Sequence, residues 1–549
     1  MSIKRTLIGP LSLVLLAAGG GHAAIVATTA TVRPENSLIV DIQVVTAGNA
    51  SRIAVTYQTD GVEALVSSWT PAERDGSTKV SIGRLRANRT YTYTVRAIDN
   101  DGGSSGTAVG TFTTGSLPAP LSLNTYALTG RTTVPLIVVP DNQPGFRGYV
   151  GLDLHSPDAP QIVWYYNNPP SNASGVQQID AVGNVLSERN GNFLFSDTGT
   201  GPGPLAADLF YREIAPDGTL LHESPPDCSV TPPPDSGNPA GWIWGQGNDT
   251  HEILLPGADG VRGTVLHLGK IVKDPFFDAG LAPKGTRLQS GTSIRRWNPA
   301  AGTDEMVWDP FQFLNPLTER TDQAGTDPGI NSDTVSPFPC AGASLQIEEW
   351  THGNSLHVAP TGVILMSVRH LNTVIAISPQ FDRIVWRLGQ IGSDFTFPNP
   401  NDKFYFSHFV RMLENGNLLL YDNGTARPEA EGGRYSRALE LSLDWDSMTA
   451  TKVWEYRHQI FSGGSPVYKY ADKVGEAQRL ANGNTLVWYG ADIDPNTLLG
   501  KTPQVFTLVE ADTNPEANAV AVFDMQVPGN SPVYRAIPIP TLFGEVSAR

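Results

Sequence analysis

Three histidines and one arginine stand at related positions of an internal repeat, in a pattern that could do chemistry. Each histidine precedes a turn glycine by eight to ten residues, and Arg369 ends the apolar run after one of these turns. A lone histidine at a strand start is usually a hydrogen-bonding loop residue. Three in register, joined by an arginine, favour a site whose donors hold a tetrahedral oxyanion. The three histidine and glycine pairs are His251 with Gly260, His352 with Gly362, and His408 with Gly416.

Histidines from separate strands could instead bind zinc or copper, because imidazole is a common ligand of both metals. Arg369 argues against that interpretation, since a guanidinium is always charged and would repel the cation. We therefore expect no metal ligands and no cofactor. His357 and His370 are ambiguous neighbours of the candidate site. Four further histidines show no register and are interpreted as surface or structural residues: His155, His222, His267 and His458.

The elements that must position these residues are expected to be β-strands. Short runs rich in Val, Ile, Thr, Tyr and Trp alternate with Gly, Pro, Asn and Asp, which predicts an all-β protein. From about residue 121, Asn-Gly pairs between apolar runs mark hairpins, and other strands end in tryptophan. The recurring features are Asn190-Gly191, Asn415-Gly416 and Asn482-Gly483, with Trp164, Trp308, Trp386 and Trp454.

This repeat, at spacings of roughly 55 to 100 residues, is typical of a β-propeller. Six blades is the best count for residues 121–549, with five or seven left open. In a propeller the strand entering each hairpin is usually the inner one. The three histidines would then converge on one mouth of the central channel, with Asp180 and Glu476 at loosely equivalent places.

The N-terminus predicts export. Lys4 and Arg5 precede an apolar run and then small residues, so residues 1–24 are expected to form a signal peptide. The protein would then be periplasmic or extracellular. Cys228 and Cys340 could form one disulfide in that setting, although their spacing alone does not decide it.

Composition restricts the partners. The formal net charge of −16 argues against nucleic acid and anionic membrane, and no apolar run is long enough to insert into a bilayer. A homo-oligomer is left open. Five Asn-x-Ser/Thr sequons matter only if the host glycosylates them; they start at Asn49, Asn88, Asn172, Asn248 and Asn423.

Residues 25–116 are expected to form a separate small β-domain. Leu85, six residues before Tyr91, and the closing run Phe112-Thr113-Thr114 resemble a fibronectin type III β-sandwich with its tyrosine corner. Residues 115–120 form the linker to the propeller. Such modules are usually spacers or adhesion units, and no chemistry is assigned to this one.

Two motifs carry a second resemblance, over roughly residues 121–549. The stretches 349–355 (Glu-Trp-Thr-His-Gly-Asn-Ser) and 367–375, with His408 ahead of 420–424, resemble the PAPS-independent bacterial arylsulfate sulfotransferases. That family implies an exported six-bladed propeller with three histidines and one arginine at the channel mouth. The family's closely spaced disulfide has no counterpart in Cys228 and Cys340.

The resemblance implies ping-pong transfer of a sulfuryl group from an aryl sulfate to a phenol, so the partners would be these small molecules. His408 would be the nucleophile that forms a sulfohistidine, and His352 the general acid and base. Arg369 and His251 would hold the sulfuryl oxygens. Trp350, Phe404, Tyr405 and Phe406 could stack on the aryl ring or could be packing residues. A non-catalytic exported propeller that binds a ligand or partner is the alternative, together with a metal-binding propeller enzyme.

Overall fold

The structure is a computed structural model, and it describes most of the chain. The described residues are 12–13, 23–100, 102–123, 126–143, 145–155, 158, 160–167, 185–189, 192–199, 208–224, 229–230, 245–254, 260–261, 263–273, 288–316, 318–319, 347–462, 465–494, 500, 504–513, 519–529 and 534–548.

The all-β prediction is confirmed, because the regular structure of the described residues consists of strands and short 3-10 helices. None of the helices in the described part of the chain is long and apolar enough to cross a membrane. The 3-10 helices are η1 (Leu121–Leu123), η3 (Pro310–Gln312), η5 (Arg369–Leu371), η6 (Pro400–Asp402) and η7 (Glu429–Glu431).

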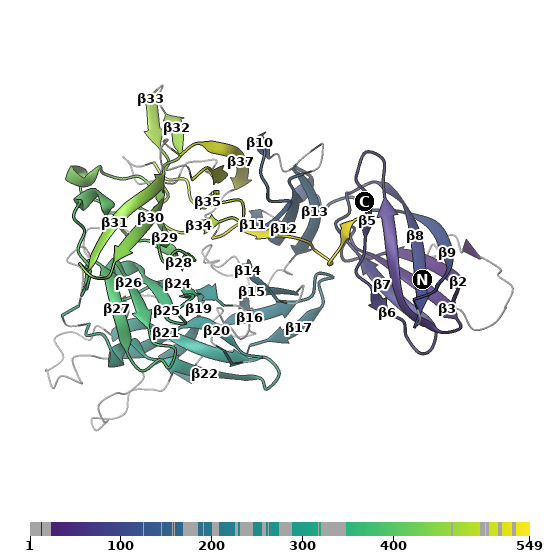
Figure 1. The fold of residues 1–549 in the computed structure, drawn as a ribbon, viewed down its shortest axis with the longest axis horizontal. Helices are drawn as coiled ribbons and strands as arrows, with labels where there is room; N and C mark the ends of the chain where they lie inside the picture. Colours follow the sequence, from purple (N-terminus) through teal and green to yellow (C-terminus); the bar gives the residue numbers. More distant parts are fainter. Residues whose placement is uncertain are drawn as a thin grey trace, which may run out of the picture.

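Two sheets lie at one end of the molecule, on the right of Figure 1. The first has the strand order β1-β2-β3-β7, and the second has the order β39-β5-β4-β8-β9, with β6 also paired to β4. Their strands are β1 (Ser12–Leu13), β2 (Ala24–Val32), β3 (Val40–Ala47), β4 (Ala50–Gln58), β5 (Leu65–Val66), β6 (Thr70–Pro71), β7 (Ser77–Ile82), β8 (Thr90–Asp99), β9 (Ser104–Thr113) and β39 (Val546–Ser547).

The apolar alternation of these strands explains why they pack face to face. In β3 and β7, every second residue is buried, so one side chain row of each strand enters the core between the sheets. Tyr91 stacks on Phe112 with 5.3 Å between ring centroids, and its hydroxyl accepts a 2.9 Å bond from the Arg86 N–H. This bond has the form of a tyrosine corner. The identification of the fold as fibronectin type III stays a prediction.

The described part of the chain from residue 127 forms six sheets of four to six strands and one two-stranded hairpin. Three of the sheets have the orders β13-β12-β11-β38, β14-β15-β16-β17 and β18-β19-β20-β21-β22, with β23 pairing β21 in parallel. Their strands are β11 (Leu136–Gln143), β12 (Phe146–Asp153), β13 (Gln161–Asn167), β14 (Val185–Arg189), β15 (Asn192–Gly199), β16 (Asp208–Ile214), β17 (Leu220–Glu223), β18 (Ser229–Val230), β19 (Gly245–Ile253), β20 (Val265–Lys273), β21 (Leu288–Asn298), β22 (Thr303–Trp308), β23 (Ile347–Glu349) and β38 (Ile537–Ile539).

The other three sheets have the orders β24-β25-β26-β27, β28-β29-β30-β31 and β10-β37-β36-β35-β34. Successive sheets contact one another through β19 with β24, β24 with β28, and β28 with β34. Their strands are β10 (Ala127–Gly130), β24 (Gly353–Val358), β25 (Ile364–Val368), β26 (Thr373–Ile377), β27 (Ile384–Gly389), β28 (His408–Met412), β29 (Leu418–Asp422), β30 (Arg437–Asp444), β31 (Thr449–Tyr456), β34 (Glu476–Arg479), β35 (Thr485–Tyr489), β36 (Gln504–Ala511) and β37 (Ala521–Gly529), beside the hairpin β32 (Gln459–Ser462) and β33 (Ser465–Tyr468).

The repeat features take the expected places in these sheets. Gly416 and Gly483 have φ values of 85° and 89°, which suit glycine. Gly416 lies in the turn between β28 and β29, and Gly483 lies in the turn between β34 and β35. The tryptophans of the repeat lie on outer strands and are buried, so they pack the sheets together. They are Trp164 on β13, Trp308 on β22, Trp386 on β27 and Trp454 on β31.

Early and late strands of the region after residue 126 pair with one another. β10, from the start of the repeat, pairs with β37 near its end, and β38 pairs with β11. The last strand, β39, leaves this region and pairs with β5 of the N-terminal sheets, so the C label lies beside β5 in Figure 1.

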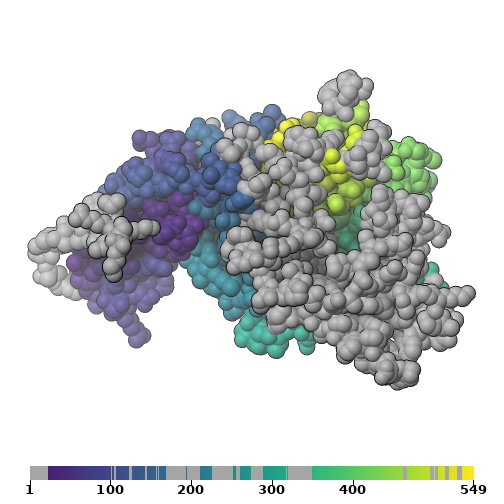
Figure 2. Space-filling view, turned by 180° about the vertical axis from the view of Figure 1, so that it is seen from behind, coloured from purple at the N-terminus to yellow at the C-terminus, as the bar shows by residue number. Residues whose placement is uncertain are grey.

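The N-terminal sheets are attached to the rest through polar contacts as well as β39. Arg33 binds Asp41 of its own sheet and Asp217 beyond β16, each at 2.9 Å. Asn36 donates to the Tyr165 carbonyl at 2.6 Å. In the view from behind, the purple N-terminal residues adjoin the blue residues that follow them in the chain (Figure 2).

A buried group of charges joins three sheets to the C-terminal segment. Arg535 binds both carboxylate oxygens of Glu252 on β19, at 2.6 and 2.9 Å, and both residues are 1 % exposed. Arg411 on β28 lies 3.6 Å from the same carboxylate. The Ala536 N–H donates to Glu476 on β34. Burial is the main cause that raises the pKa of Glu476, to about 7.

Removing one member of this group should destabilise the fold. Arg535→Met leaves the Glu252 carboxylate buried without its bidentate partner, and should lower the free energy of unfolding by about 3–5 kcal/mol. Urea denaturation of the whole chain measures this. Adding Glu252→Gln should recover part of the loss. Arg383→Met, at an exposed ion pair with Asp382, is the control and should cost less than about 1 kcal/mol.

Candidate functional site

His408 makes a side-chain hydrogen bond to Asn423, and this bond orients the imidazole ring. It is the first residue of β28 and is 2 % exposed. Its Nδ1 lies 2.6 Å from the side-chain oxygen of Asn423, just after β29. The Asn423 amide nitrogen donates to two main-chain carbonyls, of Ala471 at 2.8 Å and Val474 at 2.9 Å.

These bonds fix the tautomer of His408. A carbonyl can only accept, so the NH₂ group of Asn423 must face residues 471 and 474, and its oxygen must face His408. Nδ1 of His408 therefore carries the hydrogen. In the neutral ring, the lone pair is then on Nε2, which is the form a nucleophile needs.

His352 lies in a strained segment between β23 and β24. Its φ of 51° is in the left-handed region, which is uncommon outside glycine and recurs at functional sites. Its Nδ1 lies 2.8 Å from Oε2 of Glu349. Lys270 on β20 lies 3.1 Å from the other carboxylate oxygen. The site therefore includes a carboxylate and a lysine that the sequence motifs did not assign.

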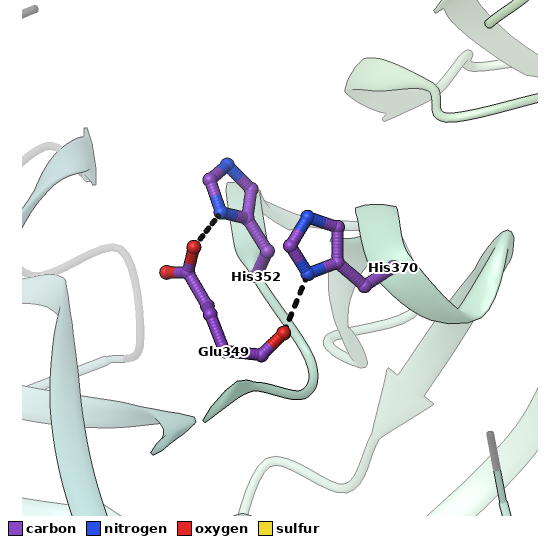
Figure 3. Close-up of side chains that lie close together, drawn as sticks. All are labelled: Glu349, His352 and His370. Carbon is purple, nitrogen blue, oxygen red and sulfur yellow. Dashed lines mark hydrogen bonds and ion pairs between the residues drawn. The ribbon is translucent and has the colours of Figure 1, made fainter. Parts of the chain in front are cut away.

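His370 stacks on His352, with ring centroids 4.7 Å apart and an angle of 27° between the rings. Its Nδ1 donates to the main-chain oxygen of Glu349 at 2.7 Å, so Glu349 contacts both imidazoles (Figure 3). The Arg369 guanidinium donates to Nε2 of His370 at 3.1 Å. Burial, followed by the charges of His352 and Arg369, holds the pKa of His370 well below its usual range.

Arg369 opens η5, directly after β25, and is 6 % exposed. Its backbone N–H donates to the His352 carbonyl at 3.0 Å. The guanidinium lies over the Phe406 ring, 5.0 Å from the centroid, and donates to the Asp472 carbonyl at 3.1 Å. The loop around Asp472 thus contacts both Arg369 and Asn423.

Short contacts connect the His352 segment to the His408 segment. Asn354 donates through its side chain to the Ser407 carbonyl at 2.8 Å. Its own main-chain oxygen accepts a 2.7 Å bond from the hydroxyl of Tyr534, whose ring lies 6.1 Å from the His408 ring. The structure therefore brings His352, Arg369 and His408 into one connected site. Tyr534 lies near the other end of the chain, and no sequence signal pointed to it.

His251 is the fourth predicted site residue. His251 lies within β19, two residues before the end of that strand, and its side chain is outside the described residues. Cys228, Cys340 and Asp180 also lie outside them. Asn423, the start of one sequon, is fully buried at His408, so the fold leaves no room for a glycan there.

The remaining histidines fit structural roles where their contacts are described. His267 is fully buried and bonds Asp304 and the Leu268 carbonyl. His458 bonds Tyr456. The four aromatic residues considered for ring stacking are all under 5 % exposed, which indicates packing. They are Trp350, Phe404, Tyr405 and Phe406.

Glu349, His352 and His370 also form the one group of described residues whose ligand atoms lie close enough together to hold a metal ion. The hydrogen bonds do not fit that use. Nδ1 of His370 donates to a carbonyl, and its Nε2 accepts from Arg369, so metal ligation would break a bond and place a cation against a guanidinium. The contacts favour hydrogen-bond and proton chemistry.

Comparison with known families gives one match. The arylsulfotransferase (ASST) family model matches residues 297–535. This range contains His352, Arg369 and His408 but not His251. The family resemblance of the sequence motifs is therefore confirmed for this part of the chain, and with it a sulfotransferase region. No curated protein matches the chain.

Solved structures give only distant similarity. A protein of unknown function from Bacteroides caccae is 15 % identical, with a TM-score of 0.35, over 74 % of this chain and 100 % of its own. Streptogramin B lyase is 12 % identical, with a TM-score of 0.30, over 85 % and 94 %. Virginiamycin B lyase from Staphylococcus aureus is 10 % identical, with a TM-score of 0.27, over 87 % and 99 %. At these TM-scores the likeness carries no argument about function.

The stability of the protein should depend on pH through its buried histidines. The pKa values of His357 and His458 are lowered to about 3 and 4, mainly by burial, and that of His370 is also lowered. Below about pH 6.5 the unfolded chain binds protons at these histidines while the folded protein does not, so stability falls as pH falls. Glu476 opposes this loss of stability, because below about pH 7 its carboxyl group binds a proton in the folded protein that the unfolded chain does not bind.

Urea denaturation between pH 5 and 6 should therefore give a loss of about 2 kcal/mol per pH unit. His357→Gln removes one of the neutral histidines and should reduce that slope by about 1.4 kcal/mol per pH unit. A slope that is flat or of opposite sign would contradict the buried neutral state.

Proposed function

Because residues 297–535 match the arylsulfotransferase family, we propose that this protein transfers a sulfuryl group from an aryl sulfate ester to a phenol. The reaction is ping-pong, needs no nucleotide donor and passes through a sulfohistidine. The observation that carries the proposal is the tautomer of His408, inside the matched range, in which Nδ1 bonds Asn423 and the lone pair is on Nε2.

In the first half-reaction, Nε2 of His408 attacks the sulfur, and the bond between sulfur and the aryl oxygen breaks. The sulfuryl group is then on Nε2, and the phenolate oxygen receives a proton from His352. In the second half-reaction, His352 takes the proton of an incoming phenol, whose oxygen attacks the sulfur and releases His408. Phenolates leave readily, which allows an aryl sulfate to act as donor.

Arg369 and His251 complete the proposed site by stabilising charge on the sulfuryl oxygens in a loose transition state. The support for Arg369 is its position, since its guanidinium lies over Phe406, two residues before the nucleophile. His251 is retained from the resemblance alone. Tyr534, whose ring lies in a T-shaped arrangement with that of His408, is the aromatic residue best placed to contact an aryl group.

We also propose the finer architecture, a six-bladed propeller behind a fibronectin type III-like domain at residues 25–116. Contacts between β38 and β14, β14 and β19, and onward through β24, β28 and β34 support a ring of six inner strands. The bond from Ala536, next to β38, to Glu476 on β34 would close that ring. Export through a signal peptide at residues 1–24, to the periplasm or the cell exterior, belongs to the same proposal.

The reaction predicts an acceptor-dependent release. Purified protein with p-nitrophenyl sulfate should release nitrophenol much faster when a phenol is added, because the sulfohistidine needs an acceptor to turn over. His408→Ala should abolish release and any acid-labile labelling by sulfate. His222→Gln is the control, because that imidazole lies half-exposed on β17, outside the site.

Release that ignores the acceptor would indicate a sulfatase and would contradict the proposal. Release that survives His408→Ala would show that His408 is not the nucleophile.

Arg369 gives a second expectation. Arg369→Lys keeps one charge but cannot reproduce the planar fork that reaches both His370 and Asp472. We expect kcat/KM for p-nitrophenyl sulfate to fall by about 100-fold to 1,000-fold, the usual effect of removing one oxyanion donor. Steady-state kinetics measure this. An Arg369→Lys enzyme within about threefold of the parent would exclude the role.

A further inference from the structure

Glu349 is built into a rigid position beside the proposed acid and base. It ends β23, where it aligns with Ser290 of β21 in a parallel pair. The next residue, Trp350, donates its backbone N–H to the Ser290 carbonyl at 3.0 Å and its indole N–H to the Glu319 carbonyl at 2.8 Å. The backbone on both sides of the carboxylate is therefore fixed.

The two carboxylate oxygens of Glu349 have different partners. Oε1 lies 3.1 Å from Lys270, and Oε2 lies 2.8 Å from Nδ1 of His352. Burial by itself would raise the pKa of Glu349, but the charges of His352 and Lys270 outweigh it and hold this pKa well below its usual range. The carboxylate is thus ionised at neutral pH.

This contact assigns the hydrogens of His352. An ionised carboxylate can only accept a hydrogen, so its 2.8 Å distance from Nδ1 favours a hydrogen on that nitrogen, and proton exchange is assigned to Nε2. The carboxylate also stabilises the imidazolium that forms when Nε2 takes a proton, as the aspartate does in a serine protease triad.

His370, which stacks on His352, bonds a main-chain carbonyl and a cation instead of a carboxylate. His370 contacts the main-chain carbonyl of Glu349 through Nδ1 and the guanidinium of Arg369 through Nε2. A proton added to Nε2 would point at a cation. Of the two imidazoles in Figure 3, only His352 is placed against an anion, so proton exchange is assigned to it.

Building on the proposed function, we infer that Glu349 is a positioning residue that makes His352 an effective proton donor to the leaving phenolate, so that the enzyme accepts sulfate esters of weakly acidic phenols. The proton moves from Nε2 of His352 to the aryl oxygen as the bond between sulfur and oxygen breaks. A weakly acidic phenol needs this proton most, because its phenolate is a poor leaving group.

The test is the dependence of the rate on the leaving group. Donors of decreasing phenol acidity are p-nitrophenyl, phenyl and p-methylphenyl sulfate, each measured with one fixed phenol acceptor. Glu349→Gln keeps the shape and removes the charge. We expect kcat/KM to fall by less than about threefold for p-nitrophenyl sulfate and by about 100-fold for p-methylphenyl sulfate.

The control is Glu440→Gln, another carboxylate with both oxygens bonded, to Asn417 and Arg479, on β30 outside the site. It should leave the donor series unchanged. The double variant Glu349→Gln/His352→Gln should be no slower than His352→Gln alone, because Glu349 acts only through that imidazole.

An equal loss for every donor, or losses that add in the double variant, would overturn the inference. If Glu349→Gln does not fold, His352→Gln tests the same point, since an unchanged dependence on phenol acidity would also overturn it. A parent enzyme that transfers from none of the donors would instead contradict the proposed function.

Discussion

The site depends on one hydrogen bond, from Nδ1 of His408 to the side chain of Asn423. The amide of Asn423 is itself fixed by two carbonyls in the loop at residues 471–474, so three separate segments decide the state of one imidazole. The same loop accepts a bond from Arg369. The side chains of Asn423, which holds His408, and of Arg369 are therefore bonded to the same short stretch of backbone.

The sequence predicted those parts of the fold and site that repeat. Asn-Gly turns and tryptophans near strand ends depend on a few neighbouring residues, so Gly416, Gly483 and Trp454 lie where the sequence pattern predicted them. His352, Arg369 and His408 were found by their register. Lys270 and Tyr534 were not, because each reaches the site from a distant strand or segment and carries no local signal. Asn423 lay in the stretch 420–424, but only the fold shows its bond to His408. Glu349 stood in a quoted motif, but only the fold shows its two oxygens meeting Lys270 and His352.

The stacked pair His352 and His370 illustrates why residue type alone does not assign a role. His352 comes just before β24 and His370 comes shortly after β25 of the same hairpin, and both contact Glu349. One meets its carboxylate and the other its main-chain carbonyl, and Arg369 adds a cation on one side only. The two imidazoles therefore differ in their surroundings, which a short stretch of sequence cannot display.

The pairing of early strands with late strands has a consequence for folding. β11 pairs with β38, and β5 pairs with β39, although both partners come much later in the chain. Without these partners two sheets would have an unpaired edge, the kind of surface on which chains join one another. Pairing between residues so distant in sequence is also slow. β38 and β39 thus cover two sheet edges on which other chains could otherwise pair.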